Sequence, residues 1–517
     1  MKWSLVTRLL EEKIKEKGLE FESRLCGAED PDVCDVFSDS RKVSRRSVFC
    51  CVKGERSDGH GYIAEAVKRG AAALVCERGA GRDVNVSVPF ILVRSAREVM
   101  GELASIVYGG PSSGLFTVGV TGTNGKSTTT YILRAILREA GVKTGLLGTI
   151  IESDGATERD AERTTPESPE IQKHMSNMLK NACGACVMET SSHGLYIGRL
   201  SGALFDAAVF TNLYPEHLDF HKDMENYFQA KRLLFAKHLK ADPLVAINAD
   251  DPYGLRLLKE FGSARGFSVS RSDTQISDIA ALADRLHVAS DINLSMNGAV
   301  FTVNAAGFPA LSLKSPLIGM FNVYNALSAV TALRGKVCDE AIARGVAKIP
   351  QVPGRLERYE ASNGAVCIVD FAHTPEALRS ALSTVRSFCR GKLISVFGHG
   401  GGRYAQNRRS LGSVAAALAD HIIITMDNPR DEDPKQIALS IAQGIEESET
   451  KASYEVILDR KEAIGAAMNI AGSGDAVVVS GKGPEKFLLI KNEKIPYSDA
   501  ETIKELIEEL IGELIEK

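Results

Sequence analysis

One glycine-rich run constrains the fold of this chain more than any other feature: Gly119-Val-Thr-Gly-Thr-Asn-Gly-Lys-Ser127. It ends the apolar stretch 116–120 and precedes a helical pattern that starts near Thr128. A glycine-rich turn between a strand and a helix directs backbone N–H groups inward, where they and the helix N-terminus bind phosphate oxygens. Lys126 can reach the outer phosphates of a nucleotide, and the hydroxyl of Ser127 can ligate magnesium. The run therefore predicts a phosphate-binding loop after a parallel strand.

This loop is a variant of the general phosphate-loop pattern. The pattern places a glycine five residues before the Gly-Lys pair, where this chain has Val120, and Gly122 lies inside the loop instead. A phosphate loop does not identify a reaction, because motors, GTPases, kinases and ligases all use one. The other polar clusters of the chain must therefore decide the function.

The length and the alternation of patterns predict an α/β protein of several domains. A chain of 517 residues is expected to form about three domains. Turn-rich breaks at 109–114 and 349–354 divide it into blocks 1–111, 112–352 and 353–517. From Leu115 onward, strand-like runs alternate with helical runs, which predicts parallel strands joined by crossover helices. The expected strands include 48–52, 72–76, 90–93, 144–151, 365–370, 393–397, 421–426 and 476–480.

Charge and cysteine usage exclude several classes of protein. The net charge is −4, from 62 basic and 66 acidic residues, so there is no basic excess for nucleic acid or anionic lipid. No apolar run reaches the roughly 18 residues of a membrane span, and residues 1–18 lack the apolar stretch of a secretory signal. We therefore expect a cytoplasmic protein without nucleic-acid or membrane partners. Ten cysteines are too few for a disulfide scaffold, so buried thiols are expected at positions such as Cys76 and Cys367.

Cys183-Gly-Ala-Cys186 has the spacing of a redox or zinc motif. The chain has no second cysteine pair or suitable histidine pair near it in sequence, so a metal or redox role is not favoured.

Polar side chains follow two further strand-like runs. Glu189 ends one of them, where a carboxylate of a parallel sheet points into the ligand crevice. The segment 211–221 follows another and contains His217 and His221, four residues apart. The segment is not His-Glu-x-x-His, so zinc is disfavoured and His221 reads as an ordinary hydrogen-bonded histidine. His217 with Glu189 and Ser127 could complete a magnesium shell.

Lys231 lies in the helical run 225–235 among Phe228, Leu234 and Phe235. Most lysines are exposed, but these neighbours suggest partial burial. Burial lowers the pKa of a lysine and makes the neutral amine available for chemistry.

Together these motifs resemble the Mur ligase family, whose members are ATP-dependent amino-acid ligases of bacterial cell-wall synthesis. The resemblance covers nearly the whole chain and includes the departure at Val120. The motifs follow in family order at 121–128, 189–195, 212–219, 227–231, 319–325, 353–357 and 369–375. The family's architecture implies a central phosphate-loop sheet, a preceding uridine-nucleotide-binding α/β domain and a Rossmann-like C-terminal domain.

The resemblance implies a site for ATP and Mg²⁺. The implied ATP-binding residues are Gly122, Thr123, Asn124, Gly125, Lys126, Ser127, Thr128, Asn322, Asn325, Arg355 and Asp370. The implied metal ligands are Ser127, Glu189, His217 and Lys231, the last after carbon dioxide has converted its amine into a carbamate. Lys126, Glu189, His217 and Lys231 are the expected catalytic residues.

Within the family, the resemblance is greatest to members that add the third residue to UDP-N-acetylmuramoyl-L-alanyl-D-glutamate. The implied contacts to that sugar-dipeptide are Ser40, Thr164, Thr165, Ser191 and Arg199. Two positions depart from the family pattern: Arg163 stands where Asn is common, and Ile197 where a polar residue is usual.

The segment Asp427-Asn-Pro-Arg430 looks like the family's recognition loop for meso-diaminopimelate. That amino acid differs from lysine by a carboxylate at its far end, which a guanidinium can bind bidentately. The implied contacts are Arg403, Asp427, Asn428, Pro429, Arg430, Gly481 and Glu485, the last as acceptor for the adjacent ammonium. Pro484, Gly402 and Glu216 replace the usual His, Asp and Asp of the family.

The implied reaction runs through an acyl phosphate. The γ-carboxylate of D-glutamate attacks ATP, and the amine of diaminopimelate then displaces the phosphate, with closure about hinges near Ser112 and Pro353 excluding water. We expect a monomer. The alternatives are a lysine-adding or folylpolyglutamate-type ligase, although the folate enzymes lack the block 1–111, and a nucleotide-hydrolysing switch.

Overall fold

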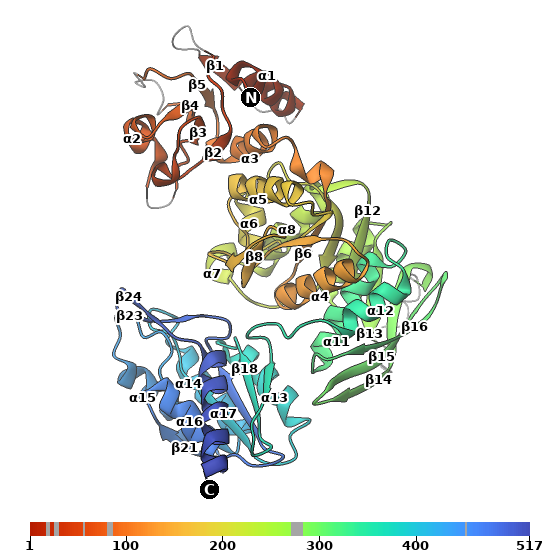
Figure 1. Cartoon of the computed structure of the whole chain (residues 1–517), viewed down its shortest axis with the longest axis vertical. Coiled ribbons are helices and arrows are strands. Elements are labelled where there is room, and N and C mark those ends of the chain that lie inside the picture. Colours follow the sequence, from red (N-terminus) through yellow and green to blue (C-terminus); the bar gives the residue numbers. More distant parts are fainter. Residues whose placement is uncertain are drawn as a thin grey trace. The chain divides into compact units, whose positions relative to one another are not determined.

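The computed structural model describes residues 1–16, 21–24, 30–54, 57–79, 86–269, 283–449 and 452–516. They form two compact units. The first comprises 1–291, 301–313 and 324–348, and the second comprises 292–300, 314–323 and 349–517. Both consist of helices packed on mainly parallel sheets (Figure 1), so the predicted α/β class is confirmed.

The first unit opens with a five-stranded sheet in the order β1-β5-β4-β3-β2, parallel except for β1. Apolar residues alternate between its faces, so α1 and α3 cover one face and α2 covers the other (Figure 1). The elements are α1 (Trp3–Glu16), β1 (Phe21–Arg24), β2 (Asp35–Phe37), η1 (Ser40–Lys42), β3 (Ser47–Cys50), η2 (Gly59–Tyr62), α2 (Ile63–Lys68), β4 (Ala71–Glu77), β5 (Phe90–Val93) and α3 (Ala96–Val107).

A larger sheet follows, in the order β16-β15-β14-β13-β12-β11-β6-β10-β7-β8-β9. Its strands from β14 to β7 are parallel, and β6 lies between β11 and β10, so the phosphate loop leaves the middle of the sheet. The strands are β6 (Phe116–Thr121), β7 (Thr144–Leu147), β8 (Ile151–Ser153), β9 (Glu158–Asp160), β10 (Ala185–Glu189), β11 (Phe205–Phe210), β12 (Leu239–Asn248), β13 (Arg265–Val269), β14 (Leu286–Ser295), β15 (Gly298–Ala305) and β16 (Phe308–Ser315).

Helices cover both faces of this sheet. One buried cluster joins α5, α6, α8 and α9 to it, and α4 packs on the strands of the other face together with α12. The helices are η3 (Pro111–Gly114), α4 (Lys126–Glu139), α5 (Ser168–Lys180), α6 (Ser192–Tyr196), α7 (Leu218–His221), α8 (Met224–Lys237), α9 (Pro252–Glu260), η4 (Ala283–Arg285), α11 (Met320–Leu333) and α12 (Asp339–Ala347).

The second unit contains a six-stranded sheet in the order β17-β18-β22-β19-β20-β21, parallel except for β17, and a separate hairpin of β23 and β24. One face packs against α13, α14 and α15, and the other against α16 and α17 (Figure 1). The elements are β17 (Glu357–Glu360), β18 (Val366–Asp370), α13 (Pro375–Arg386), β19 (Leu393–Phe397), α14 (Asn407–Leu418), β20 (His421–Ile424), α15 (Pro434–Glu446), β21 (Ser453–Val456), α16 (Arg460–Ile470), β22 (Ala476–Ser480), β23 (Phe487–Ile490), β24 (Glu493–Pro496) and α17 (Asp499–Glu516).

One predicted strand is wrong. The single strand expected over 144–151 is two antiparallel strands, β7 and β8, joined by a turn at 148–150. The chain turns there because the backbone N–H of Thr149 donates to the carboxylate of Glu189 at 2.9 Å. A side chain on Gly148 would meet that carboxylate, since its Cβ would lie 2.5 Å from Oε1 of Glu189.

The thiol prediction is confirmed for Cys76 and Cys367, which are buried and free. Cys183 and Cys186 are also free. Among the described residues, no helix is both long and apolar enough to cross a membrane.

A buried ion pair joins the start of α17 to α16 in the second unit. Nε of Arg460 donates to Asp499 at 2.7 Å, and both side chains are fully buried. The same guanidinium donates to the carbonyls of Met426 and Ser480, which follow β20 and end β22. The pair therefore fixes the ends of two strands as well as two helices.

We predict that Asp499→Ala destabilises the second unit by about 3–5 kcal/mol, because it leaves the Arg460 charge buried and unpaired. The matched control is Lys461→Ala, which removes an exposed pair with Glu505 and should leave the free energy of unfolding almost unchanged. Urea unfolding of the full chain, followed by circular dichroism, measures both. The single tryptophan, Trp3, reports separately on the first unit by fluorescence. Equal losses in the two variants would contradict this role of the buried pair.

Candidate active site

The phosphate loop of the first unit is held in a conformation that only glycine adopts easily. Gly122 has φ +148° and Gly125 has φ +87°. A Cβ on Gly122 would lie 1.8 Å from Oγ1 of Thr211, and one on Gly125 would lie 2.3 Å from Oδ1 of Asn325. The loop is therefore packed on both sides, and Asn325, one of the implied ATP-binding residues, lies directly against it.

The segment after β11 is hydrogen-bonded to the phosphate loop. The hydroxyl of Thr211 donates to the carbonyl of Asn124 at 2.6 Å, and Oδ1 of Asn212 accepts the N–H of Asn124 at 2.9 Å. The N–H of Thr123 donates to the carbonyl of Asn212 at 2.9 Å. Ser127 and Thr128 follow in the first turn of α4, where both are buried.

Two lysines converge on one carbonyl of this loop. Nζ of Lys126 donates to the carbonyl of Gly122 at 2.9 Å, and Nζ of Lys231 donates to the same oxygen at 2.7 Å. Lys126 also donates to the carbonyl of Thr123 at 2.8 Å. The ammonium of Lys231 lies 4.4 Å from the centre of the Tyr227 ring. The structure thus brings a lysine from α8 and the loop lysine to one point.

Lys231 is 1 % exposed. Burial lowers its pKa well below the ordinary value, and the positive charge of Lys126 lowers it further. A lysine with a lowered pKa holds a larger fraction of neutral amine at neutral pH. Only the neutral form can react with an electrophile such as carbon dioxide.

Glu189 ends β10, next to β6, and is buried. Its Oε1 accepts the N–H of Thr149 at 2.9 Å, and its Oε2 accepts the Thr149 hydroxyl at 3.0 Å. The carboxylate is therefore fixed by the turn between β7 and β8.

The two histidines after β11 differ in setting. His217 has φ +56°, is exposed and directly precedes α7 as its N-cap residue. Desolvation lowers its pKa, opposed by Glu216 and assisted by Lys126 and Lys231. His221 is buried and its Nε2 lies 3.0 Å from the hydroxyl of Ser192, as expected for an ordinary hydrogen-bonded histidine. Burial lowers the pKa of His221 to about 4.

The residues expected to hold the sugar-dipeptide lie together next to Glu189. The Thr165 hydroxyl donates to the carbonyl of Glu189 at 2.9 Å, and its oxygen lies 3.0 Å from Oγ of Ser191. Oγ1 of Thr164 lies 3.1 Å from Oγ1 of Thr149, whose single proton goes to Glu189. Thr164, Thr165 and Ser191 therefore belong to the same hydrogen-bonded network as the carboxylate.

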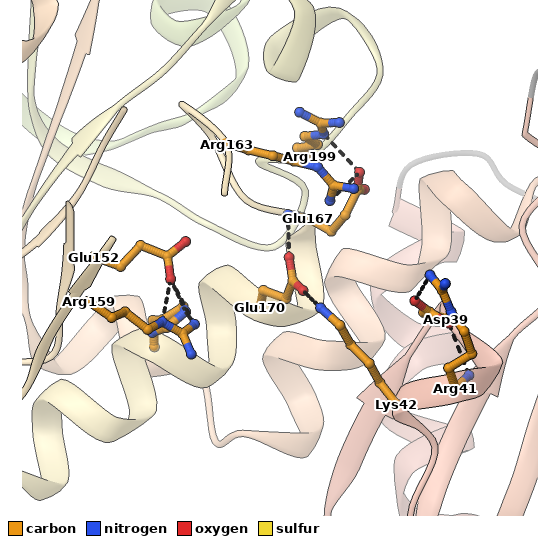
Figure 2. A network of polar contacts seen from close by, with 10 residues as sticks. Asp39, Arg41, Lys42, Glu152, Arg159, Arg163, Glu167, Glu170 and Arg199 are labelled. Carbon is orange, nitrogen blue, oxygen red and sulfur yellow. Dashed lines mark hydrogen bonds and ion pairs between the residues drawn. The ribbon is translucent and has the colours of Figure 1, made fainter. Parts of the chain in front are cut away.

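Arg199 belongs to a cluster of arginines around one carboxylate, Glu167 (Figure 2). Nε of Arg199 donates to Oε1 of Glu167 at 3.0 Å, and its NH1 donates to the carbonyl of Thr165 at 3.1 Å. Arg163 pairs with the same Oε1 at 3.6 Å, and Arg97 of α3 donates to Oε2 at 3.1 Å. Because one carboxylate faces three guanidiniums, the cluster has a surplus of positive charge.

Ser40 begins η1, between β2 and β3, and its hydroxyl donates to Glu65 at 3.1 Å. The neighbouring Lys42 pairs with Glu170 of α5 at 2.8 Å, and Lys173 pairs with Asp35 at 2.6 Å (Figure 2 shows the first of these). These ion pairs join the opening sheet to α5.

Other predicted residues lie in the second unit. Asn322, at the start of α11, is buried and donates to the carbonyl of Ile318 at 2.8 Å. Oδ2 of Asp370 accepts the N–H of Leu356 at 2.8 Å, next to Arg355, whose guanidinium lies over the Phe371 ring. Burial raises the pKa of Asp370, and Arg355 opposes that rise.

The expected amino-acid-binding residues are also gathered in the second unit. Arg430 has φ +52°, and its NH1 donates to the carbonyl of Gly401. A Cβ on Gly400 would lie 3.3 Å from that NH1 and 3.4 Å from Cγ of Arg403, so the two arginines flank Gly400. The N–H of Gly401 donates to the carbonyl of Asn428 at 2.9 Å, which joins the glycine run 400–402 to segment 427–430.

Glu485, whose carboxylate was expected to accept from the ammonium of the bound amino acid, already accepts from a buried lysine. Nζ of Lys482 donates to Oε2 of Glu485 at 3.0 Å and to Oδ1 of Asn428 at 3.1 Å, and Lys482 is fully buried. Nδ2 of Asn428 donates to the same Oε2 at 2.8 Å. A Cβ on Gly481 would lie 2.7 Å from Oδ2 of Asp427. Pro484 packs on the loop before β17, since a Cβ on Gly354 would lie 2.4 Å from its nitrogen.

Sequence reasoning missed three residues that organise these groups: Thr149, Glu167 and Lys482. Thr149 lay inside an expected strand, and Glu167 had no motif. Lys482 directly follows the expected contact Gly481, and its position between two glycines at a strand end was the available signal.

A glycine-rich loop with two converging lysines, at the carboxyl end of a central parallel strand, defines a nucleotide-binding enzyme of the phosphate-loop class. Sequence models of three domains match in order: "Mur ligase family, catalytic domain" over 35–108, "Mur ligase middle domain" over 120–333 and "Mur ligase, glutamate ligase domain" over 354–483. The chain belongs to the Mur ligase family, and it is a ligase.

Individual relatives match over nearly the whole chain. A UDP-N-acetylmuramoyl-L-alanyl-D-glutamate–2,6-diaminopimelate ligase of Clostridium tetani is 39 % identical over 96 % of this chain and 100 % of its own length. One of Clostridium botulinum is 40 % identical over 91 % and 94 %. A solved structure of a ligase with that name has a TM-score of 0.65 and 28 % identity, covering 92 % and 95 % of the two chains. A MurF ligase of Thermotoga maritima in complex with ADP, 20 % identical with a TM-score of 0.60 over 92 % and 97 %, shares the fold.

We predict that Gly122→Ala raises the Kd for ATP at least about tenfold, because φ strain costs about 1–3 kcal/mol and the new methyl displaces Thr211. The matched control is Gly110→Ala, which also has a positive φ but whose Cβ would meet nothing closer than 3.9 Å. Equilibrium binding of a non-hydrolysable ATP analogue measures both. Equal affinity in the two variants would contradict the tight fit of the loop.

Proposed function

We propose that the protein is an ATP-dependent amide ligase that adds meso-diaminopimelate to the D-glutamate of UDP-N-acetylmuramoyl-L-alanyl-D-glutamate during peptidoglycan precursor synthesis. The observation that carries the proposal is the full-length similarity to ligases of that name, together with the phosphate loop and the two lysines on the carbonyl of Gly122. The expected domains 1–111, 112–352 and 353–517 remain part of the proposal, and the three matched segments fall within them. We further propose that it acts in the cytoplasm as a monomer.

The donor set of the first unit fits magnesium. Mg²⁺ prefers oxygen ligands, and the hydroxyl of Ser127 and the carboxylate of Glu189 supply them. Thr149 engages both oxygens of Glu189 but leaves lone pairs that can face a cation. His217 and a carbamate on Lys231 would complete the set. When bound, magnesium neutralises the charge that develops on the phosphates.

Carbamylation resolves an electrostatic conflict at the loop. Two ammonium groups share the carbonyl of Gly122, and Lys231 is buried there. In the reaction, the ammonium first loses one proton to solvent, the neutral amine then attacks carbon dioxide to form a C–N bond, and a second proton leaves to solvent. The product is a carbamate anion, which removes one buried positive charge and gains an attraction to Lys126.

The proposed chemistry assigns a role to each group of this chain. Lys126 stabilises the charge that develops as the γ-carboxylate of D-glutamate takes the terminal phosphoryl group of ATP. Thr164, Thr165, Ser191 and Arg199 would orient that glutamate, and Ser40 would hold the uridine nucleotide. Arg355, Asp370, Asn322 and Asn325 would bind the remainder of the ATP. The amine of the incoming amino acid then attacks the acyl carbon, and inorganic phosphate leaves.

The second unit supplies groups suited to an amino acid with two charged ends. Arg430 can bind a carboxylate bidentately, and Arg403 can bind a second one. The carboxylate of Glu485 and the carbonyl of Gly481 can accept from an ammonium group. Asp427, Asn428 and Pro429 hold the loop that presents Arg430.

We predict that phosphate release requires ATP, the UDP-sugar-dipeptide and meso-diaminopimelate together, and that lysine does not replace the last. Arg430→Ala should raise the KM for diaminopimelate about tenfold or more, because a hydrogen bond to a charged group is worth about 1.5–3 kcal/mol. The control is Arg409→Ala, an exposed arginine of α14 in the same unit. Release with lysine alone would indicate the lysine-adding alternative, and release without an amino acid would indicate a nucleotide-hydrolysing switch.

A second prediction concerns Lys231. Lys231→Ala should abolish ligation, and added short carboxylic acids should restore part of the rate by occupying the place of the carbamate. The matched control, Lys237→Ala, removes an exposed lysine from the same helix and should leave the rate unchanged. Loss of activity without rescue, in a variant that still binds ATP, would contradict the carbamate.

A further inference from the structure

Three side chains of metal-ligand type converge in the first sheet, and none of them is among the residues assigned to the reaction. They are Cys51, His60 and Cys76, and one donor atom of each lies within 4.8 Å of the others. The two sulfurs are 3.9 Å apart. Both cysteines are fully buried, and the His60 side chain is 9 % exposed.

The register of two parallel strands brings the sulfurs together. β3 pairs with β4 so that Cys50 lies opposite Val75, and the next residues along the two strands are Cys51 and Cys76. The N–H of Cys51 donates to the carbonyl of Val75 at 2.8 Å, which extends this pairing by one residue. Both thiols belong to the cluster on one face of the sheet, whereas Cys50 belongs to the cluster on the other face.

His60 is held in the tautomer that ligates metals. Its Nε2 accepts the N–H of Glu77 at 2.9 Å, so Nε2 has the lone pair and Nδ1 bears the proton. Nδ1 then donates to Oδ1 of Asp58 at 2.6 Å. Metal-ligating histidines commonly donate their second ring N–H to a carboxylate in this way, which fixes the ring and makes it more basic. Glu77 follows Cys76 directly, so this lone pair points at the chain that bears one of the two thiols.

The spacing suits a tetrahedral ion. Zinc–sulfur bonds of about 2.3 Å at a tetrahedral angle separate two sulfurs by about 3.8 Å, close to the observed 3.9 Å. Two cysteines and one histidine are a soft donor set, which selects zinc and similar ions over magnesium.

We propose that Cys51, Cys76 and His60 form a binding site for one thiophilic divalent cation of the Zn²⁺ type. The ion would take the two sulfurs and Nε2 of His60, with water as the fourth ligand. Both thiols lose their protons to solvent on binding. Nε2 of His60 gives up its hydrogen bond from the N–H of Glu77, so that its lone pair can ligate the ion. The ion would join β3, β4 and η2 into one cross-linked segment.

Cobalt(II) is the probe that tests the site in the full-length protein. Chelator-treated protein is titrated with Co²⁺ in excess magnesium, and the absorption spectrum is recorded. We expect one equivalent of Co²⁺ to give sulfur-to-cobalt charge-transfer absorption and the intense visible bands of a tetrahedral site, both removed by equimolar Zn²⁺. Co²⁺ bound to oxygen and nitrogen ligands at the phosphate loop would give neither band. Absence of both bands in the wild-type protein would overturn the proposal.

Variants separate this site from other thiols. Cys51→Ser and Cys76→Ser should each abolish the charge-transfer band, whereas Cys50→Ser, a buried cysteine of the opposite face, should retain it. The double variant Cys183→Ser/Cys186→Ser should also retain it. A band that survives both Cys51→Ser and Cys76→Ser, or is lost in the 183/186 double variant, would refute the assignment.

One further variant keeps the test valid if core substitutions unfold the sheet. Asp58→Asn changes a half-exposed side chain outside the core and retains an oxygen to cap η2. It should weaken Co²⁺ binding about 10–100-fold while leaving the circular dichroism spectrum unchanged, because the carboxylate behind His60 is lost. Unchanged Co²⁺ affinity in this variant would contradict ligation by His60.

Discussion

The site of the first unit depends on the carbonyl oxygen of Gly122, which accepts hydrogen bonds from two lysines. Gly122 adopts φ +148°, a conformation that a residue with a side chain would resist. The close approach of Thr211 excludes a Cβ in any case. One lysine comes from the loop itself and the other from α8, so this one atom fixes both the phosphate-binding loop and a helix more than a hundred residues later in the chain.

Much of the fold could be predicted from the sequence, because parallel strands and their crossover helices appear along the chain as short apolar runs that alternate with helical patterns. The strand expected at 90–93 matches β5, and those at 393–397 and 476–480 match β19 and β22. The phosphate loop was recognisable because its chemistry lies in consecutive residues. The strand over 144–151 failed for the opposite reason: the chain turns there to satisfy Glu189, which lies on another strand.

The residues of the candidate site also differ in whether the sequence could reveal them. Residues within compact motifs, such as Lys126 and Asp427–Arg430, could be chosen from sequence. Partners that act across the fold could not. Lys482 reads as an ordinary lysine until the structure shows it buried between Asn428 and Glu485. The same limit applies to cysteines: Cys183 and Cys186 have a motif spacing, whereas Cys51 and Cys76 have none and meet only through the register of β3 and β4.

The buried pair of Arg460 and Asp499 has a consequence for biosynthesis. Ribosomes make the chain from its N-terminus, so Arg460 emerges well before its partner. Until Asp499 arrives, burying Arg460 would place an uncompensated charge in an apolar interior, which is strongly unfavourable. During that interval the carbonyls of Met426 and Ser480, after β20 and at the end of β22, therefore lack their hydrogen bonds from this guanidinium. We therefore expect the hydrogen bond to the carbonyl of Met426, which directly precedes segment 427–430, to form only after the start of α17 has been synthesised.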